Sequence, residues 1–228
     1  NDIYGILMDA IHAEIKEVKS DFNRTEEIWS IVKGIVWVVK NNWMKPDKGI
    51  WEFRSEDLHF TFSKVLCWVA IDRAIKIAKI VEKKDAVKKW NPIKIAIKKD
   101  IETNAWNEKV KAYTQSYGSD YLDASVLLIE QYGFIDANEE RFISTVNVIE
   151  KELAYDGLLY RYKNKDDFGL PTSSFTICTF WFIKSLIKIG QVEKAKGYFE
   201  NLLNYSNHLG LFSEDIDFKT KRLLGNFP

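Results

Sequence analysis

The stretch from Phe60 to Val81 reads FTFSKVLCWVAIDRAIKIAKIV, and its apolar residues recur at helical spacing. Phe62, Leu66 and Val69 fall on one helical face, and the pattern continues as far as Ala78. The apolar face is wide, which is typical of a helix that is buried on most sides. We therefore expect a long, buried helix in this part of the chain.

The rest of the sequence also indicates helices joined by loops, with little strand character. The expected helices span residues 3–19, 24–42, 58–83, 90–105, 120–132, 138–154, 173–189 and 191–205. A glycine can adopt the left-handed conformation that ends a helix, and Gly133, Gly157, Gly190 and Gly210 follow such ends. Candidate N-terminal caps are Asp136 or Asn138, and Ser173 or Ser174. No Pro-rich or Gly-rich linker divides the chain, so we expect a single helical domain over residues 1–228.

The composition limits the classes of partner. The chain has 228 residues, of which 46% are hydrophobic, and this suits a globular domain with a sizeable core. Its 33 basic and 33 acidic residues balance to a net charge of zero, which gives no electrostatic case for nucleic acid or an anionic membrane. The longest apolar run, residues 65–71, is too short to span a bilayer. No signal peptide is visible, and we expect a cytoplasmic protein.

The cysteines and histidines give no sign of disulfide or metal chemistry. Cys67 and Cys178 each lie inside an apolar helical run, where buried free thiols are expected. The histidines at positions 12, 59 and 208 lack metal-ligand spacing. We therefore expect neither a metal nor a cofactor. Asp72 and Asp123 lie in predicted helices, where we expect structural roles.

Two acidic residues stand in aromatic loops: Glu52 follows Trp51, and Glu214 follows Phe212 and Ser213. A carboxyl group that packs against an aromatic ring loses water, which favours its protonated form and lets it act as an acid. Two separated carboxyl groups are the minimum equipment for hydrolysing a glycosidic bond. The residues alone leave alternatives open. Glu52 can be a surface acid, and Ser213 can cap a helix whose first turn holds Glu214.

Aromatic residues are also frequent in the other predicted loops. A plain helical bundle does not need them, whereas a sugar-binding pocket does, because aromatic rings stack on the apolar faces of pyranose rings. The alternative is that these rings seal helix ends against water. The loop aromatics are Trp43, Trp51, Phe53, Tyr117, Tyr160, Tyr162 and Phe212.

Longer blocks of sequence surround the two acids. The block DKGIWEFR at residues 47–54 is followed by HFTFSKV at residues 59–65 and WVAIDRA at residues 68–74. Later blocks lie at residues 115–118, 122–125, 158–162, 178–181 and 210–228. Together, and in this order, they resemble the prokaryotic branch of glycoside hydrolase family 15, which contains glucoamylases, glucodextranases and trehalases. The resemblance covers nearly the whole chain.

The resemblance implies a fold and a catalytic pair. The implied fold class is all-α, an incomplete (α/α)6 toroid in which about eight of the twelve helices are present. Glu52 matches the family's general acid and Glu214 its general base, in a reaction that inverts the anomeric configuration. Inverting pairs stand roughly 6.5–9.5 Å apart to leave room for a water molecule.

The resemblance also implies substrate-binding residues. Arg161 matches the family's sugar-binding arginine, because a guanidinium can give two parallel hydrogen bonds to neighbouring sugar oxygens. The structural alternative is an ion pair between Arg161 and Asp166 or Asp167. The other expected substrate-binding residues are Trp51, Phe53, Arg54, Gln115 and Tyr117, and for Gln115 and Tyr117 loop packing is an equal alternative.

The implied function is that of an exo-acting α-glucosidase of the glucoamylase type, which releases glucose from the non-reducing ends of α-glucans. The alternatives are a trehalase of the same family and a catalytically weak carbohydrate-binding fragment. The chain begins at a point that resembles the middle of a family catalytic domain, and the family's early Trp-Pro-Arg-Asp loop is absent. An open ring exposes apolar helix flanks, so we expect a homo-oligomer or association with a separate amino-terminal part.

Overall fold

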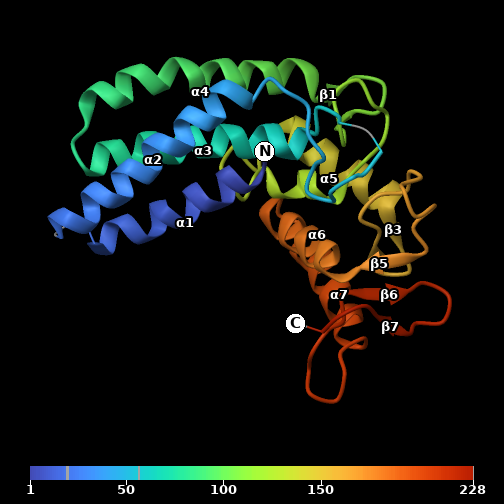
Figure 1. Cartoon of the computed structure of the whole chain (residues 1–228). Helices are drawn as coiled ribbons and strands as arrows, with labels where there is room; N and C mark the ends of the chain where they lie inside the picture. Colours follow the sequence, from blue (N-terminus) through green and yellow to red (C-terminus); the bar gives the residue numbers. More distant parts are fainter. Residues whose placement is uncertain (19–20, 56, 228) are drawn as a thin grey trace. The chain divides into compact units, whose positions relative to one another are not determined.

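The structure is a computed structural model that describes residues 1–18, 21–55 and 57–227 (Figure 1). The chain forms two compact units, of which the first holds residues 1–52 and 56–105 and the second holds residues 53–55 and 106–228. The expected single domain stays a prediction, because compactness alone does not decide whether the two units fold independently.

The first unit is built from four helices. They are α1 (Ile3–Val18), α2 (Phe22–Asn42), α3 (Thr61–Ile80) and α4 (Lys84–Asn104). Helix α3 is the long buried helix expected from the sequence: it packs against α1, α2 and α4, and every side chain from Thr61 to Ala74 is buried. Helix α4 begins six residues before the expected start at residue 90 and contains Pro92, so this proline does not mark a helix boundary.

A cluster of charges around the buried Asp72 and Arg73 ties three of these helices together. Arg73 donates from Nε to Asp9 Oδ1 at 2.6 Å and from Nη1 to Asp72 Oδ2 at 2.8 Å. Lys76 and Lys94 also pair with Asp72. Burial alone would raise the pKa of Asp72, but the hydrogen bonds from Lys76 and Arg73 outweigh it and lower the pKa. Asp72 therefore has the structural role expected of it, since a buried charge is tolerated only when it is paired.

The second unit combines helices with short strands. Its helices are α5 (Glu140–Leu153), α6 (Thr176–Lys188), α7 (Val192–Leu203) and the 3-10 helix η1 (Ala124–Leu128). Two antiparallel pairs are β1 (Trp106–Asn107) with β2 (Ala112–Tyr113), and β3 (Ala154–Tyr155) with β4 (Leu158–Leu159). A three-stranded antiparallel sheet has the order β5 (Ser173–Phe175), β6 (Asp215–Asp217) and β7 (Leu223–Leu224). Helix α6 packs against α7, η1 and β4.

Two helix predictions in the second unit are wrong in part. Residues 120–132 do not form an α-helix, because tertiary hydrogen bonds hold the segment's backbone: the Gln115 N–H donates to the Tyr121 carbonyl, and the Ala124 N–H donates to the Arg161 carbonyl, each at 2.8 Å. Only the short η1 forms there. The helix expected at 173–189 begins at Thr176, because residues 173–175 pair with β6.

The predicted helix caps are also wrong. Glu139 and Phe175 are the N-cap residues of α5 and α6, and neither makes a side-chain cap hydrogen bond. At α6 the carbonyl oxygen of Glu214 accepts the Thr176 N–H at 2.9 Å instead. A distant backbone carbonyl therefore satisfies a helix start that the sequence assigned to Ser173 or Ser174.

Other expectations hold in part. Gly133, Gly157, Gly190 and Gly210 all have positive φ angles, but of these four only Gly190 directly follows the C-cap of an α-helix, α6. Gly157 lies in the turn between β3 and β4, and no α-helix directly precedes Gly133 or Gly210. Cys67 and Cys178 are buried free thiols as expected. The remaining helix bounds lie within about three residues of those expected, although the predicted end of the first helix, residue 19, lies outside the described residues. The described part of the chain holds seven α-helices and the 3-10 helix η1, which agrees with the expected count of about eight helices. None of its helices is both long and apolar enough to cross a membrane.

Candidate active site

Glu52 lies in an exposed turn of the first unit, between α2 and α3. Asp47 and Leu58 close the base of this loop with two backbone hydrogen bonds of 2.9 Å. Gly49, at φ 66°, packs against Phe60 so closely that a Cβ would lie 2.8 Å from the ring. Glu52 itself has a φ of 53°, a conformation that residues with side chains rarely adopt. Such strain persists only where the surrounding structure enforces it, so the loop holds Glu52 in a defined conformation.

Lys64 anchors the chain where it enters the Glu52 loop. Lys64 lies on α3 and is only 2% exposed. Its Nζ donates to the carbonyl oxygen of Lys45 at 2.7 Å and to that of Trp43, and a cation suits these carbonyls at the end of α2. Burial lowers the pKa of Lys64. The sequence signal for this anchor is a lysine inside an otherwise apolar helical stretch.

Phe53 and Arg54 follow Glu52 in the chain but pack in the second unit. The ring centroid of Phe53 lies 5.3 Å from that of Tyr162. The Arg54 N–H donates to Asp167 Oδ2 at 2.7 Å, and the Arg54 guanidinium carbon lies 5.2 Å from the centroid of the Phe168 ring. The structure thus brings both predicted residues into contact with the segment that follows Arg161.

Arg161 forms the ion pair that was the structural alternative to a sugar-binding role. Its Nη2 lies 3.0 Å from Asp166 Oδ2, which also accepts the Tyr162 hydroxyl at 2.7 Å. The other oxygen, Asp166 Oδ1, accepts the Phe168 N–H at 2.7 Å. Burial alone would raise the pKa of Asp166, but these hydrogen bonds and the charge of Arg161 lower it. The sugar-binding role of Arg161 stays a prediction.

Gln115 belongs to a buried network close to Arg161. Its Nε2 donates to Asp123 Oδ2 at 2.9 Å, and Asp123 Oδ1 accepts the Ser125 N–H at 2.7 Å. Gln115 and Asp123 are 4% and 2% exposed, so Asp123 has the structural role expected of it. Tyr117 is half-buried in the neighbouring turn. Contacts of Gln115 and Tyr117 with a sugar stay predictions.

Glu214 is held by backbone groups from two distant segments. Its N–H donates to the carbonyl oxygen of Asn226 at 2.8 Å, and its own carbonyl oxygen accepts the Thr176 N–H at 2.9 Å. Its carboxylate Oε2 accepts the Asn226 N–H at 3.2 Å. Gly225, at φ 74°, lies so close that a Cβ would be 2.7 Å from the same oxygen. The position of the carboxylate is therefore set by the start of α6 and by the turn after β7.

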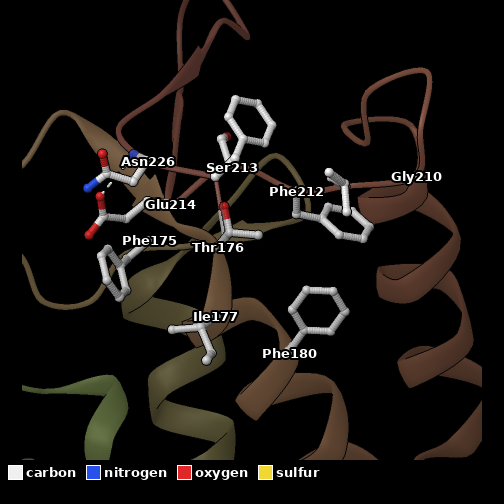
Figure 2. Close-up of a pocket in the computed structure, with 11 residues that line it drawn as sticks. Phe175, Thr176, Ile177, Phe180, Gly210, Phe212, Ser213, Glu214 and Asn226 are labelled. Atoms are coloured by element: carbon white, nitrogen blue, oxygen red, sulfur yellow. Dashed lines mark hydrogen bonds between the residues drawn. The ribbon is translucent and has the colours of Figure 1, made fainter.

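Glu214 lines a pocket of about 520 Å³ within the second unit (Figure 2). Phe180 and Phe212 meet edge-on in its wall, with ring centroids 5.2 Å apart. The wall is otherwise mostly apolar, and among the described residues that line it, Glu214 is the one charged side chain. A pocket of this size can accommodate a small ligand such as a sugar unit. Its apolar lining residues are Phe175, Ile177, Phe180, Leu211, Phe212 and Phe227.

The residues beside Glu214 are tied into strand β6. Ser213 Oγ donates to the Asp215 carbonyl at 2.6 Å, and β6 begins at Asp215. The alternative that Ser213 caps a helix is therefore wrong. The Asp215 carboxyl accepts the Ser173 hydroxyl at 3.0 Å. Burial raises the pKa of Asp215, although the hydrogen bond from Ser173 acts to lower it. The neighbouring charge of Glu214 raises this pKa further.

The two expected catalytic acids lie in different units, Glu52 in the first and Glu214 in the second. Their expected separation of roughly 6.5–9.5 Å stays a prediction. Sequence reasoning missed the groups that hold these acids in place, namely Lys64, Gly225 and Asn226. Gly225 and Asn226 gave no signal beyond their place in the last sequence block.

Comparisons with known proteins agree on a family. The model for "Glycosyl hydrolases family 15" matches residues 1–228. The chain is 40% identical over 231 residues to a trehalase of Thermoplasma acidophilum, 38% over 228 residues to one of Thermoplasma volcanium, and 39% over 233 residues to one of Mycolicibacterium smegmatis. These matches cover 100% of this chain but only 39%, 36% and 34% of the relatives, so the chain spans little more than a third of their length.

Solved structures share the fold. A wild-type glycosidase matches 94% of this chain with a TM-score of 0.78 and 13% identity, and the match covers 56% of that protein. A variant of a glycosidase in complex with glucose matches with the same TM-score, at 12% identity over 94% of this chain and 56% of that one. Together with the predominance of helices, this likeness confirms the expected fold class, an incomplete helical toroid.

Proposed function

The chain belongs to glycosyl hydrolases family 15, and on this premise we propose that it supplies the catalytic acid and base of an enzyme that hydrolyses trehalose. The observation that carries the proposal is the identity of 38–40% to three trehalases over the whole of this chain. Release of glucose from α-glucans, the first expectation from the sequence, has less support, because these relatives are trehalases.

In the proposed reaction Glu52 is the general acid and Glu214 the general base. The protonated Glu52 carboxyl gives its proton to the glycosidic oxygen as the bond from that oxygen to the anomeric carbon breaks. On the opposite face, the Glu214 carboxylate takes a proton from a water molecule whose oxygen bonds to the same carbon. Water and trehalose become two glucose molecules, and the attacked anomeric carbon is inverted.

The surroundings of Glu214 support its role as the base. A general base must be held within hydrogen-bond reach of the water that it activates. The Asn226 N–H fixes Oε2 at 3.2 Å, and the Thr176 N–H fixes the backbone of Glu214 to the first turn of α6 at 2.9 Å. The carboxylate is thus oriented by backbone groups, which move less than side chains, while it stays exposed to a ligand.

The sugar-binding part of the proposal rests on Trp51, Arg161, Gln115 and Tyr117. Trp51 is half-buried directly before Glu52, where its ring can line the subsite for the glucose unit that is attacked. Arg161 has five N–H donors, so pairing with Asp166 at 3.0 Å is compatible with further hydrogen bonds to sugar hydroxyls. Because the chain spans little more than a third of its trehalase relatives, we propose that activity needs further protein, from the same polypeptide or from an associated chain.

The test is glucose release by the full-length protein from trehalose, maltose and maltooligosaccharides. Glu52→Gln and Glu214→Gln should each lower kcat on trehalose by roughly 10²–10⁴-fold, the usual contribution of a general acid or base. Glu200→Gln, at an exposed position of α7, is the matched control and should leave kcat unchanged. A preference for maltooligosaccharides would favour the glucoamylase alternative. Release of no glucose from any substrate would leave only a carbohydrate-binding protein.

A further inference from the structure

A turn in the second unit presents an aromatic ring to solvent. Phe168 lies in this turn and is 79% exposed, and Leu170 two residues later is 67% exposed. Single exposed apolar residues are common on protein surfaces, so exposure alone does not mark a site. What distinguishes Phe168 is the number of contacts that fix the turn around it.

The turn is anchored from within by Asp166. Its backbone N–H donates to the Gly169 carbonyl at 2.9 Å, and the Gly169 N–H donates to the Asp166 carbonyl at 3.2 Å. Its side chain, 6% exposed, accepts the Phe168 N–H at 2.7 Å and also binds Tyr162 and Arg161. Three donors on one buried carboxylate make a rigid support, so Phe168 stands on a fixed backbone rather than on a loose loop.

A second anchor connects the turn to Arg54. The Arg54 N–H donates to Asp167 Oδ2 at 2.7 Å, and its guanidinium lies over the Phe168 ring at 5.2 Å. Arg54 is two residues after Glu52, so their Cα atoms are at most about 7 Å apart along the chain. The exposed ring, a guanidinium and a carboxylate therefore meet beside the segment that carries the proposed acid.

We propose that Phe168 is a sugar-binding residue that stacks against the glucose unit released as the leaving group. The proposal rests on the proposed function, in which Glu52 protonates the oxygen that joins the two sugars. The leaving glucose carries this oxygen, and Arg54 follows Glu52 by only two residues in the chain. Arg54 and Asp167 complete the subsite.

The three side chains offer complementary contacts to a pyranose. The face of a glucose ring that carries axial C–H groups is apolar and packs on an aromatic face, whereas its hydroxyls lie around the rim. A guanidinium donates hydrogen bonds in a fixed fork, and a carboxylate accepts them. Because the hydrogen bonds of Asp166 hold the backbone of the turn, Phe168 binds a sugar without the entropic cost of ordering a loose loop.

The experiment compares Phe168→Ala, Phe168→Trp and the matched control Leu170→Ala in the full-length protein. Phe168→Ala should raise KM for trehalose about 10-fold, the factor that one good aromatic contact supplies, with little change in kcat, because the contact serves ground state and transition state alike. Phe168→Trp should stay within about twofold of wild type, and Leu170→Ala should not change KM. All three should keep the wild-type melting temperature, since both side chains are exposed.

Trehalose binding to the Glu214→Gln variant, measured by saturation-transfer NMR with and without Phe168→Ala, separates the two proposals. An active enzyme whose KM and trehalose binding do not change in Phe168→Ala would overturn the Phe168 subsite alone. If trehalose binding depends on Phe168 but the protein without substitutions cleaves no trehalose, the proposed hydrolysis is overturned and Phe168 remains a sugar-binding residue. A protein that neither binds nor cleaves trehalose would overturn both.

Discussion

Substitution of Gly225 by alanine should damage catalysis through the position of one carboxylate. A Cβ at this position would lie 2.7 Å from Glu214 Oε2 and 3.0 Å from Glu214 Cβ. To reach ordinary van der Waals contact, the carboxylate must retreat by about 0.7 Å, and this movement also weakens its hydrogen bond with the Asn226 N–H. A misplacement of about 1 Å in a catalytic group can cost about 100-fold in rate. We therefore expect kcat on trehalose to fall roughly 10–100-fold in Gly225→Ala.

Backbone strain must be separated from this steric effect, because Gly225 has a φ of 74°. Alanine at such an angle costs roughly 1–2 kcal/mol of stability. Gly190→Ala is the matched control: Gly190 has a φ of 82°, and a Cβ added there would point into open space, with no neighbouring group within 4 Å. Both variants should lose similar stability in urea unfolding, while only Gly225→Ala should lose kcat, with KM nearly unchanged. Equal kcat values for the two variants would refute the proposed positioning of Glu214.

Two further predictions concern the anchors around the site. Asp166→Asn should destabilise the protein at neutral pH, and the difference from wild type should vanish in acid. The folded-state pKa of Asp166 is below its ordinary value of 3.8. The stabilisation by the ionised carboxylate is therefore complete above pH 3.8 and is lost as the pH falls through the lower folded-state pKa. Urea unfolding of both proteins across this pH range measures the difference in stability, and a difference that does not depend on pH would contradict the prediction. Lys64→Met leaves the carbonyls of Trp43 and Lys45 without their ammonium donor, so we expect a loss of roughly 1–3 kcal/mol together with a lower kcat. Wild-type kcat in this variant would show that Lys64 does not position the Glu52 loop.

Local pattern was enough to predict most helices. The apolar periodicity between Phe60 and Val81 predicted α3, which is indeed buried by three other helices. Helix prediction failed where distant backbone groups intervene. A helix was predicted at residues 120–132, but the bonds from Gln115 to Tyr121 and from Ala124 to Arg161 hold their backbone in another conformation. No feature within residues 120–132 signals these partners.

In the candidate site, too, the sequence predicted the key side chains but not the distant groups that contact them. The resemblance of whole sequence blocks nominated Glu52 and Glu214, and the ion pair of Arg161 with Asp166 was foreseen as an alternative. The groups that orient Glu214 were not foreseen, because they come from the start of α6 and from the turn after β7 and act through backbone atoms. Backbone donors leave no residue-type signature, so a sequence can nominate a candidate catalytic side chain without revealing what holds it.

Glu52 and Glu214, acting as the proposed acid and base, should hydrolyse trehalose with inversion. The most direct test is the anomeric composition of the glucose first released from α,α-trehalose, followed by proton NMR before mutarotation. Inversion at one anomeric carbon predicts equal amounts of β-glucose and α-glucose in the first spectra, because the leaving glucose keeps its α configuration. The initial appearance of α-glucose alone would indicate retention and would contradict the assignment of Glu214 as a base that activates water.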